Sequence, residues 1–474
     1  MRHIAIVGRG CVLPGALSPT ALYALVQEGR DATSEVPADR WRLDPASVHC
    51  GPDEESTDRT WSLRGGYVRD EVRVAGLDHL DPMVHWAAFA AQQALDGVSL
   101  NGRGDVVLGN LSFPSSLHSA FAEGTWLAER ASGVGLGDVA AENRFSSGLV
   151  AHHVASHLGL SGEAYCLDAA CASSLYAIAQ ACDRLRDGLC DVAIAGAVNR
   201  ADDLFIHIGF CALQAMSRTG QSRPFHRQAD GLVPGEGAAV VALKRLDDAL
   251  RDGDPVYGVI RGVGLSNDGR GKSLLAPAVE GQVAAMQRAY ADAGWAPGDV
   301  DLVECHATGT PVGDATELDS TGRLFAHRSD VPIGSLKGNL GHLVTAAGAA
   351  GLIKVLEGMR HGMLPGTRLP ADPTPALADS PFRLVGGDES WVGRRRAAVS
   401  AFGFGGNNAH LLVEAFDEAA PIEASVPLTR NRLAITGLSL RHGDGEGVAD
   451  FAEDVRQQRR RGPAREVTVA LPGL

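Results

Sequence analysis

Residues 165–175 read YCLDAACASSL: a short apolar run, a turn of small residues and the first apolar position of a helix. This order predicts a buried strand that turns sharply into a helix over residues 175–186. The turn places the thiol of Cys171 at the helix N-terminus, where unpaired N–H groups and the helix dipole favour a thiolate. The N–H of Cys171 can also help to hold an oxyanion. Taken alone, the motif fits a reactive nucleophile and a buried structural cysteine equally.

The same plan occurs a second time along the chain. Residues 171–188 and 345–362 both begin with small residues, continue as an apolar helix and end at a glycine 17 positions later. Small residues let two helices approach closely, so the repeat predicts a pair of central helices related by a pseudo-twofold axis. The alternative is chance similarity in a chain rich in alanine and glycine.

Strand and helix patterns alternate through the rest of the chain, which predicts a layered α/β architecture. The motif around Gly8 and Gly10 lacks the third glycine of a dinucleotide-binding turn, so no such site is expected. Strands are expected at residues 4–7, 105–108, 192–195, 238–243, 302–304 and 397–400, and helices at residues 82–95, 175–186 and 279–293.

Composition excludes several classes of function. The chain has 43 basic and 57 acidic residues and a formal charge of −14, which disfavours nucleic-acid binding. Its sequence shows neither a leader peptide nor an apolar run of membrane-spanning length, so we expect a cytoplasmic protein that does not enter the membrane. The eight cysteines and the histidines at 152, 153 and 157 lack a zinc-ligand pattern, so no metal site is expected.

Two histidines follow later strands. Residues 304–314 read ECHATGTPVGD and place His306 at the end of a strand. Residues 334–342 read GSLKGNLGH and place Lys337 and His342 on a glycine-rich loop before the second small-residue helix. Such strand-to-helix loops lie at one edge of a sheet, where α/β proteins form their ligand crevices. We therefore expect both histidines to lie near Cys171.

Four motifs in this order are similar to those of the β-ketoacyl synthases of the thiolase-like superfamily: residues 168–174, 306–314, 337–342 and 402–408, the last reading FGFGGNN. The resemblance extends from residue 1 to about residue 415. It implies a duplicated thiolase-like α/β fold, layered α-β-α-β-α, with two mixed sheets around central helices. The two halves would be residues 1–250 and 251–415. Residues 416–474 read as a linker and the start of a following domain, with a strand expected at 433–437 and a helix near 448–457.

The resemblance also implies a reaction. Cys171 would carry the acyl group, and His306 and His342 would assist decarboxylation of a malonyl thioester and stabilise the enolate. The product would be a β-ketoacyl thioester formed by decarboxylative Claisen condensation. Two neutral imidazoles suit this task, since burial and a nearby cation both lower the pKa of a histidine.

Supporting roles follow from the same resemblance. Lys337, with Glu317 as its charge partner, would hold the geometry and protonation of the site. Thr308 and Thr310 would bind the phosphopantetheine arm of an acyl carrier protein. Phe404 would gate access to the nucleophile, and its backbone N–H would complete the oxyanion hole. No directly bound cofactor is expected, and the expected partners are the carrier protein, a second copy of the chain and other domains of a larger synthase.

Details of the motifs distinguish subfamilies. Modular polyketide synthases usually have TACSSS around the nucleophile and Gly-Thr-Asn in the glycine loop, whereas this chain has AACASS and Asn407. His226 stands where Arg-Pro-Phe is normally followed by aspartate. These features, and a start at Met1, are more similar to the iterative synthases of the enediyne and polyunsaturated-fatty-acid type.

Rival functions remain to be weighed. A non-catalytic chain-length partner has the same fold but lacks the nucleophile, and a modular polyketide or fatty-acid ketosynthase is the nearest enzymatic alternative. A thiolase would carry a second cysteine in a C-terminal Cys-x-Gly motif, and no cysteine follows Cys305. The run Arg394–Arg396 fits exposed charge before a strand better than a docking patch.

Overall fold

The structure is a computed structural model of the chain. It describes residues 3–38, 40–41, 43–51, 53–54, 58–111, 148–200, 204–269, 276–418, 435, 441–442 and 445–458. The chain forms two compact units, Met1–Val426 and Pro427–Leu474.

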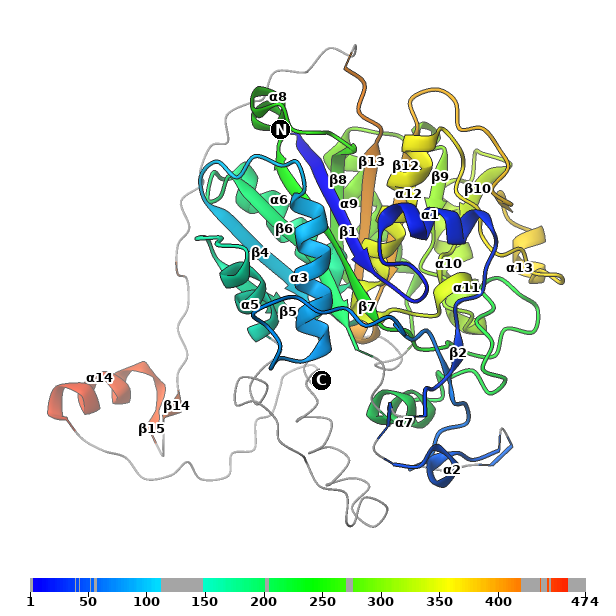
Figure 1. The fold of residues 1–474 in the computed structure, drawn as a ribbon, viewed down its shortest axis with the longest axis horizontal. Coiled ribbons are helices and arrows are strands. Elements are labelled where there is room, and N and C mark those ends of the chain that lie inside the picture. The colour runs from blue at the N-terminus through cyan, green and yellow to red at the C-terminus, as the bar shows by residue number, and fades with distance from the viewer. Residues whose placement is uncertain are drawn as a thin grey trace. The chain divides into compact units, whose positions relative to one another are not determined.

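Eleven strands of the first unit form one mixed sheet in the order β11-β10-β9-β12-β13-β8-β1-β7-β6-β4-β5 (Figure 1). Each strand expected between residues 4 and 400 lies within one of them. Their bounds are β1 Ile4–Val12, β4 Gly104–Gly109, β5 Ala164–Leu167, β6 Val192–Asn199, β7 Gly237–Arg245, β8 Gly258–Asn267, β9 Leu302–Glu304, β10 Val331–Gly334, β11 Phe382–Leu384, β12 Arg396–Phe402 and β13 Asn407–Glu414. Two short strands, β2 (Ser34–Glu35) and β3 (Arg64–Gly65), pair separately.

The large sheet uses one five-strand pattern twice. Strands β1-β7-β6-β4-β5 and β8-β13-β12-β9-β10 have the same order. In the first half, β1 pairs antiparallel with β7 and β7 antiparallel with β6, whereas β6 pairs parallel with β4 and β4 parallel with β5. In the second half, β8 pairs antiparallel with β13 and β13 antiparallel with β12, whereas β12 pairs parallel with β9 and β9 parallel with β10. This repetition confirms the duplicated fold.

The two sheets implied by the resemblance are joined into one. Strands β1 and β8 pair antiparallel over three residue pairs, from Ile4 opposite Ile260 to Ile6 opposite Gly258. Each of these strands is the edge of its own five-stranded sheet, and buried edge N–H and C=O groups need partners. Pairing the two edges satisfies these groups, so the expectation of two sheets needs this correction.

Helices lie between and outside the two halves. Helix α3 packs on β1 and β7 and α9 on β8 and β13, whereas α6 and α12 each contact strands of both halves. The layers α-β-α-β-α follow, as expected. The helix bounds are α1 Pro19–Gln27, α2 Pro45–Val48, α3 Pro82–Leu95, α5 Leu149–His157, α6 Ser173–Arg186, α7 Leu204–Ala212, α8 Leu246–Asp252, α9 Val279–Ala293, α10 Pro311–Leu324, α11 Lys337–Leu340, α12 Ala347–His361 and α13 Pro375–Ala378.

The two central helices repeat each other in backbone detail. A 3₁₀ turn precedes each helix: η2 (Ala170–Ala172) before α6 and η4 (Val344–Ala346) before α12. Ala170 and Val344, each one position before the matched residues 171 and 345, have φ values of 49° and 47°. The matched glycines at the other ends, Gly188 and Gly362, have φ values of 69° and 65°. The internal repeat is therefore structural and not a chance similarity.

Small residues hold these helices close together. The N–H of Ala349 in α12 donates to Oγ of Ser174 in α6 at 3.0 Å. A Cβ added to Gly348 would lie 2.8 Å from Cγ of Leu175. The close approach predicted from the small residues is confirmed, and it requires glycine at position 348.

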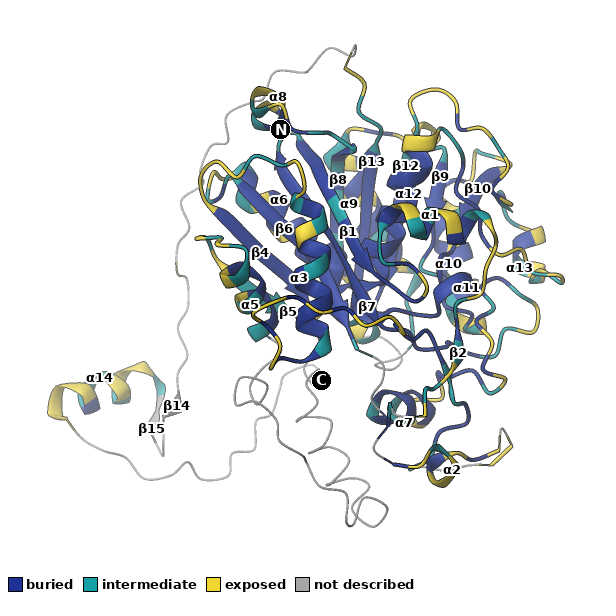
Figure 2. Ribbon diagram, in the orientation of Figure 1, coloured by how far each residue is buried: buried dark blue, intermediate teal, exposed yellow. Residues whose placement is uncertain are grey.

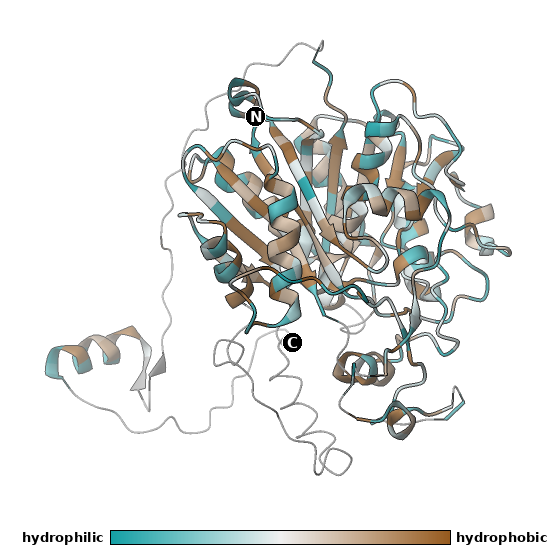
Figure 3. Ribbon diagram, in the orientation of Figure 1, coloured by the Kyte–Doolittle hydropathy of each residue, from teal (hydrophilic) through white to brown (hydrophobic). Residues whose placement is uncertain are grey.

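Burial explains the remaining sequence patterns. The strands of the sheet are almost wholly buried (Figure 2) and mostly apolar (Figure 3). Gly8 and Gly10 lie on β1 where an added Cβ would meet the carbonyl oxygens of Ala94 and Ala90 in α3, at 1.7 and 1.9 Å. These two glycines therefore serve close strand–helix packing.

The second unit contributes one small hairpin and one helix among its described residues. Strands β14 (Arg441–His442) and β15 (Gly445–Glu446) precede α14 (Gly447–Gln457), which confirms the helix expected near 448–457. The strand expected at 433–437 and the arginines at 459–461 lie outside the described residues, apart from Ile435. Over the described ranges, no helix is long and apolar enough to cross a membrane.

Candidate active site

The turn after β5 fixes the position of Cys171. Asp168 Oδ1 accepts the N–H of Ala170 at 2.9 Å, and Ser173 Oγ both accepts the N–H of Ala169 and donates to the carbonyl of Ala170. These bonds hold Ala170 in its left-handed conformation, which is costly for a residue with a Cβ. This turn conformation places Cys171 at the N-terminal tip of α6, with its thiol in a pocket.

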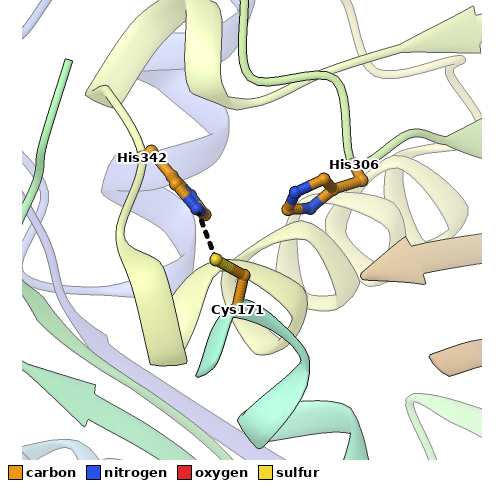
Figure 4. A group of neighbouring side chains, drawn as sticks. All are labelled: Cys171, His306 and His342. Carbon is orange, nitrogen blue, oxygen red and sulfur yellow. Dashed lines mark hydrogen bonds between the residues drawn. The ribbon is translucent and has the colours of Figure 1, made fainter. Parts of the chain in front are cut away.

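Both histidine rings converge on the sulfur (Figure 4). Nε2 of His342 lies 3.0 Å from Sγ of Cys171. The rings of His306 and His342 are 5.4 Å apart, at 82° to each other. One nitrogen of each ring and the sulfur all lie within 4.8 Å of one another. The structure thus confirms that both histidines, although distant from Cys171 in the chain, lie beside it in space.

The pocket keeps all three groups neutral. Burial, then the charge of Lys337, lowers the pKa of His306 and of His342 well below the usual value near 6.5. Burial raises the pKa of Cys171 to about 11, although Lys337 and the backbone N–H groups of Phe404 and Cys171 lower it in part. Cys171 is therefore a thiol beside a neutral imidazole, and not the thiolate expected from the helix terminus.

Lys337 and Glu317 interact at a distance. The Lys337 side chain is buried in α11, and no carboxylate lies within 4.0 Å of its ammonium in the described part of the chain. Both carboxylate oxygens of Glu317 instead accept backbone N–H groups, from His306 and Ala307, each at 2.7 Å. Burial lowers the pKa of Lys337, while Glu304 and then Glu317 raise it. Glu317 therefore fixes the His306 loop directly and acts on Lys337 only through its charge.

A buried ion pair supports the same loop, and sequence reasoning missed it. Nζ of Lys354 in α12 lies 2.7 Å from Oε2 of Glu304, at the end of β9, and both side chains are at most 3% exposed. The other oxygen of Glu304 accepts the N–H of Leu336, next to Lys337, at 2.7 Å. The available signal was a lysine within an otherwise apolar helix, since a buried charge needs a partner.

Asp314 is a second residue whose role the sequence did not reveal. Its carboxylate accepts the N–H groups of Phe225, Thr308 and Gly309 at 2.8, 3.1 and 3.1 Å. Burial raises its pKa to about 6, although these donors oppose the shift. The hydroxyls of Thr308 and Thr310 lie 3.0 Å apart on the loop that Asp314 holds.

A cavity of about 380 Å³ contains the site. Cys171, both histidines, Thr308 and Thr310 all line it. Leu213 and Val312, also on its wall, are exposed, so the cavity reaches the molecular surface. The cavity therefore leads from the molecular surface to the sulfur of Cys171.

The glycine loop closes the other side of the nucleophile. The backbone N–H groups of Phe404 and of Cys171 itself lower the pKa of the Cys171 thiol, against the larger effect of burial. A Cβ added to Gly403 would lie 3.1 Å from the Cys171 nitrogen and 2.7 Å from the carbonyl oxygen of Ala169. The phenyl ring of Phe404 lies 6.1 Å from that of Phe210, in an apolar cluster that includes Cys171.

Other candidate positions lie outside the cavity. Nδ1 of His226 accepts the N–H of Gln228 at 2.9 Å, within a surface turn. Nε2 of His157 lies 3.0 Å from Nε2 of Gln92 in α3, a helix-packing contact. Of the three consecutive arginines, Arg394 is exposed and Arg396 pairs with Glu414, so the run is not one continuous patch.

A thiol with two neutral imidazoles is also a donor set that zinc accepts. Here the nearby charge of Lys337, which lowers the pKa of both rings, opposes binding of a cation at the same place. The charge pattern suits an anion or a developing oxyanion better than a metal ion.

Two family models match the chain. The model described as "Beta-ketoacyl synthase, N-terminal domain" matches residues 1–249, and "Beta-ketoacyl synthase, C-terminal domain" matches residues 257–369. The chain belongs to the β-ketoacyl synthase family. It is an enzyme family that forms carbon–carbon bonds by acyl transfer, and the duplicated thiolase-like fold described above is the family's fold.

Relatives of this ketosynthase are parts of polyketide synthases. One component of the phenolphthiocerol/phthiocerol polyketide synthase of Mycobacterium tuberculosis is 35% identical over 99% of this chain and 27% of its own length. Pikromycin polyketide synthase component PikAIII of Streptomyces venezuelae is 34% identical over 89% of this chain and 28% of its own length. The chain therefore spans little more than a quarter of these curated relatives.

Solved structures agree with this assignment. The structure described as "PfaC Keto synthase-Chain length factor" has a TM-score of 0.86 and 35% identity, over 97% of this chain and 53% of that one. An oxazolomycin ketosynthase domain of Streptomyces albus has a TM-score of 0.78 and 32% identity, over 88% of this chain and 76% of that one.

Proposed function

We propose that this ketosynthase condenses an acyl group held on Cys171 with a malonyl thioester carried by an acyl carrier protein. The observation that carries the proposal is the 3.0 Å contact between Sγ of Cys171 and Nε2 of His342, with His306 on the other side of the same pocket. Polyketide or polyunsaturated chains of the iterative, enediyne-like type are the proposed products, because the motifs around Cys171 and Asn407 resemble that subfamily.

In the first half-reaction the thiol attacks an acyl thioester. Nε2 of His342 accepts the proton of Cys171 as the sulfur attacks the carbonyl carbon, and the tetrahedral oxyanion is held by the N–H groups of Cys171 and Phe404. Collapse of the intermediate breaks the bond to the carrier sulfur, which leaves as a thiol after taking up the proton. The acyl chain then remains on Cys171.

In the second half-reaction a malonyl thioester loses CO₂. The bond between the carboxylate and the α-carbon breaks, and its electron pair forms an enolate whose oxygen accepts hydrogen bonds from His306 and His342. The α-carbon attacks the acyl carbonyl, and the Cys171 sulfur leaves as a thiolate that takes a proton from Nε2 of His342. The imidazole recovers this proton from water, because the original proton of Cys171 left with the carrier thiol. Neutral imidazoles suit this step, because each carries one N–H that can donate a hydrogen bond to the enolate oxygen.

The carrier arm and the assembly complete the proposal. Thr308 and Thr310 line the cavity, where their hydroxyls can bind the amides of a phosphopantetheine arm. A homodimer through β5 is proposed because β5 (Ala164–Leu167) ends the described sheet and its apolar residues are only half buried. Further domains of a larger synthase would supply the carrier protein.

A substitution separates the two half-reactions. In Cys171→Ala, acyl transfer to the protein is expected to disappear, whereas decarboxylation of malonyl thioester, which needs the two histidines, is expected to continue. Intact-mass measurement follows the acyl adduct, and release of CO₂ follows decarboxylation. Equal loss of both activities would contradict the separate roles.

A chain-length partner is the second candidate, because one structural relative is described as a ketosynthase–chain length factor. Such partners lack the nucleophile, whereas Cys171 is present and contacts His342. Incubation of the unaltered protein with an acyl thioester distinguishes the two: an adduct on Cys171 supports the synthase, and its absence supports the partner.

A further inference from the structure

The turn that carries Phe404 consists of backbone conformations that glycine adopts easily. Gly405 and Gly406 have φ values of 81° and 77°, in the left-handed region. Within the turn, the N–H of Gly403 donates to the carbonyl of Asn407 at 2.7 Å, and the N–H of Gly406 donates to the carbonyl of Gly403 at 3.1 Å. These bonds close the turn on itself. The residues on either side of it already pair within the sheet, Phe402 with Asn408 and Asn407 with Asn267, so further contacts can act only on the position of its tip.

Asn267, the last residue of β8, attaches the turn from outside. Its Nδ2 donates to the carbonyl of Gly405 at 3.0 Å and to Oδ1 of Asn407 at 3.1 Å. Its own Oδ1 accepts the N–H of Gly269 at 2.8 Å. Only this orientation of the amide satisfies two acceptors and one donor at once. The side chain is therefore fixed on β8 and holds the turn at two points.

A second attachment lies deeper. The N–H of Asp268 donates to the carbonyl of Gly406 at 2.9 Å, and its carboxylate accepts Nδ2 of the buried Asn408 at 2.7 Å. By contrast, Asn267 is exposed, and Asn407 occupies a position where modular polyketide synthases usually have threonine. The outer contact is therefore the one that distinguishes this chain.

We propose that the contact between Asn267 and Asn407 sets how often the Phe404 turn moves away from Cys171, which makes Asn267 a positioning residue for acyl loading. The inference rests on the proposed function, together with the gating role that the family resemblance implies for Phe404. The same turn supplies a side chain that restricts access and an N–H that stabilises the oxyanion. Loosening it therefore has two opposite effects: small reagents reach Cys171 faster, and condensation becomes slower.

The test compares Asn267→Ala, Asn407→Ala and the double variant in the full chain. Alkylation of Cys171 by iodoacetamide is timed by intact mass, with Cys171→Ala to identify the labelled site. Asn267→Ala removes both bonds to the turn, so its alkylation is expected to be about tenfold faster. Asn407→Ala removes one of these hydrogen bonds, so its alkylation is expected to be about threefold faster. The double variant is expected to match Asn267→Ala, because the two side chains act through each other.

The matched control is Gln287→Ala, which removes an exposed amide from the neighbouring helix α9. This variant is expected to change neither the rate of alkylation nor the rate of condensation. Condensation of acyl and malonyl thioesters is expected to slow in Asn267→Ala while the melting temperature stays within about 2 °C.

Several outcomes would overturn the inference. These are unchanged alkylation in Asn267→Ala, a double variant whose effect equals the product of the two single effects, or faster alkylation without slower condensation. A Cys171 that takes up no acyl group in the unaltered protein would instead overturn the proposed function, and the inference with it.

Discussion

Replacement of Lys354 by methionine tests the buried ion pair beneath the active site. Nζ of Lys354 lies 2.7 Å from Oε2 of Glu304, and the two side chains are 1% and 3% exposed. Solvent therefore cannot compensate a charge left alone there. Lys354→Met keeps the length of the side chain but leaves the Glu304 carboxylate buried without a cation.

The expected loss in the free energy of unfolding comes from the buried charge left on Glu304 rather than from the lost attraction between Lys354 and Glu304. Removing one partner of a fully buried pair costs about 3–5 kcal/mol, because the remaining charge keeps its desolvation penalty. A large domain loses about 2 °C of melting temperature per kcal/mol, so the expected decrease is about 6–10 °C.

A neutral double variant is the control. Glu304→Gln combined with Lys354→Met removes both charges, and the glutamine oxygen can still accept the N–H of Leu336, which Glu304 binds at 2.7 Å. This variant is expected to recover most of the lost stability. Differential scanning calorimetry at one scan rate compares the three proteins. A single variant as stable as the unaltered protein, or a double variant no better than the single one, would refute the reasoning.

Two further predictions concern catalysis. Because burial and Lys337 lower the pKa of His306 and His342 well below 6.5, malonyl decarboxylation is expected to keep its rate down to about pH 6 and to fall only in stronger acid, where the rings become charged. A pH–rate profile with its midpoint near 6.5 would contradict this. Gly403→Ala places a methyl group 3.1 Å from the backbone nitrogen of Cys171, so displacement of the oxyanion donor is expected to slow condensation by about 10²-fold. Steady-state rates measure this loss, and a loss under threefold would argue against the donor.

The sequence predicted the parts of the fold that depend on local pattern. Alternating apolar runs predicted the strands, and the spacing of small residues predicted the two central helices. The structure adds that the turns before these helices have matched left-handed residues at 170 and 344. The strand-to-helix loops also predicted that His306 and His342 would lie near Cys171. Each strand, helix and loop is set by residues within about 20 positions of one another, and the distant loops were expected to meet because they lie at one edge of the sheet.

Other features depend on partners that the sequence cannot pair. Glu304 and Lys354 are 50 positions apart, and Asn267 and Asn407 are 140 positions apart. The edge pairing of β1 with β8 likewise joins segments that have no shared pattern. The state of the nucleophile was also mistaken, because the helix terminus is visible in the sequence, whereas the burial that raises the pKa of Cys171 to about 11 is not.

The duplicated turn explains how one half of the chain places Cys171, and the other half His342, at the same point in the pocket. Position 345 matches position 171, but Thr345 is fully buried and donates its hydroxyl to the carbonyl of Val198 at 2.6 Å. The useful group of the second turn is instead His342, three residues earlier, whose Nε2 reaches the sulfur.

The two turns contact each other because their helices do. The distance between sulfur and imidazole is therefore also a packing distance, set where Gly348 of α12 lies against Leu175 of α6. Any side chain at position 348 must push the helices apart by several tenths of an ångström or more. A shift of that size at the sulfur weakens the contact on which proton transfer depends, so the small residues of the central helices serve catalysis as well as folding.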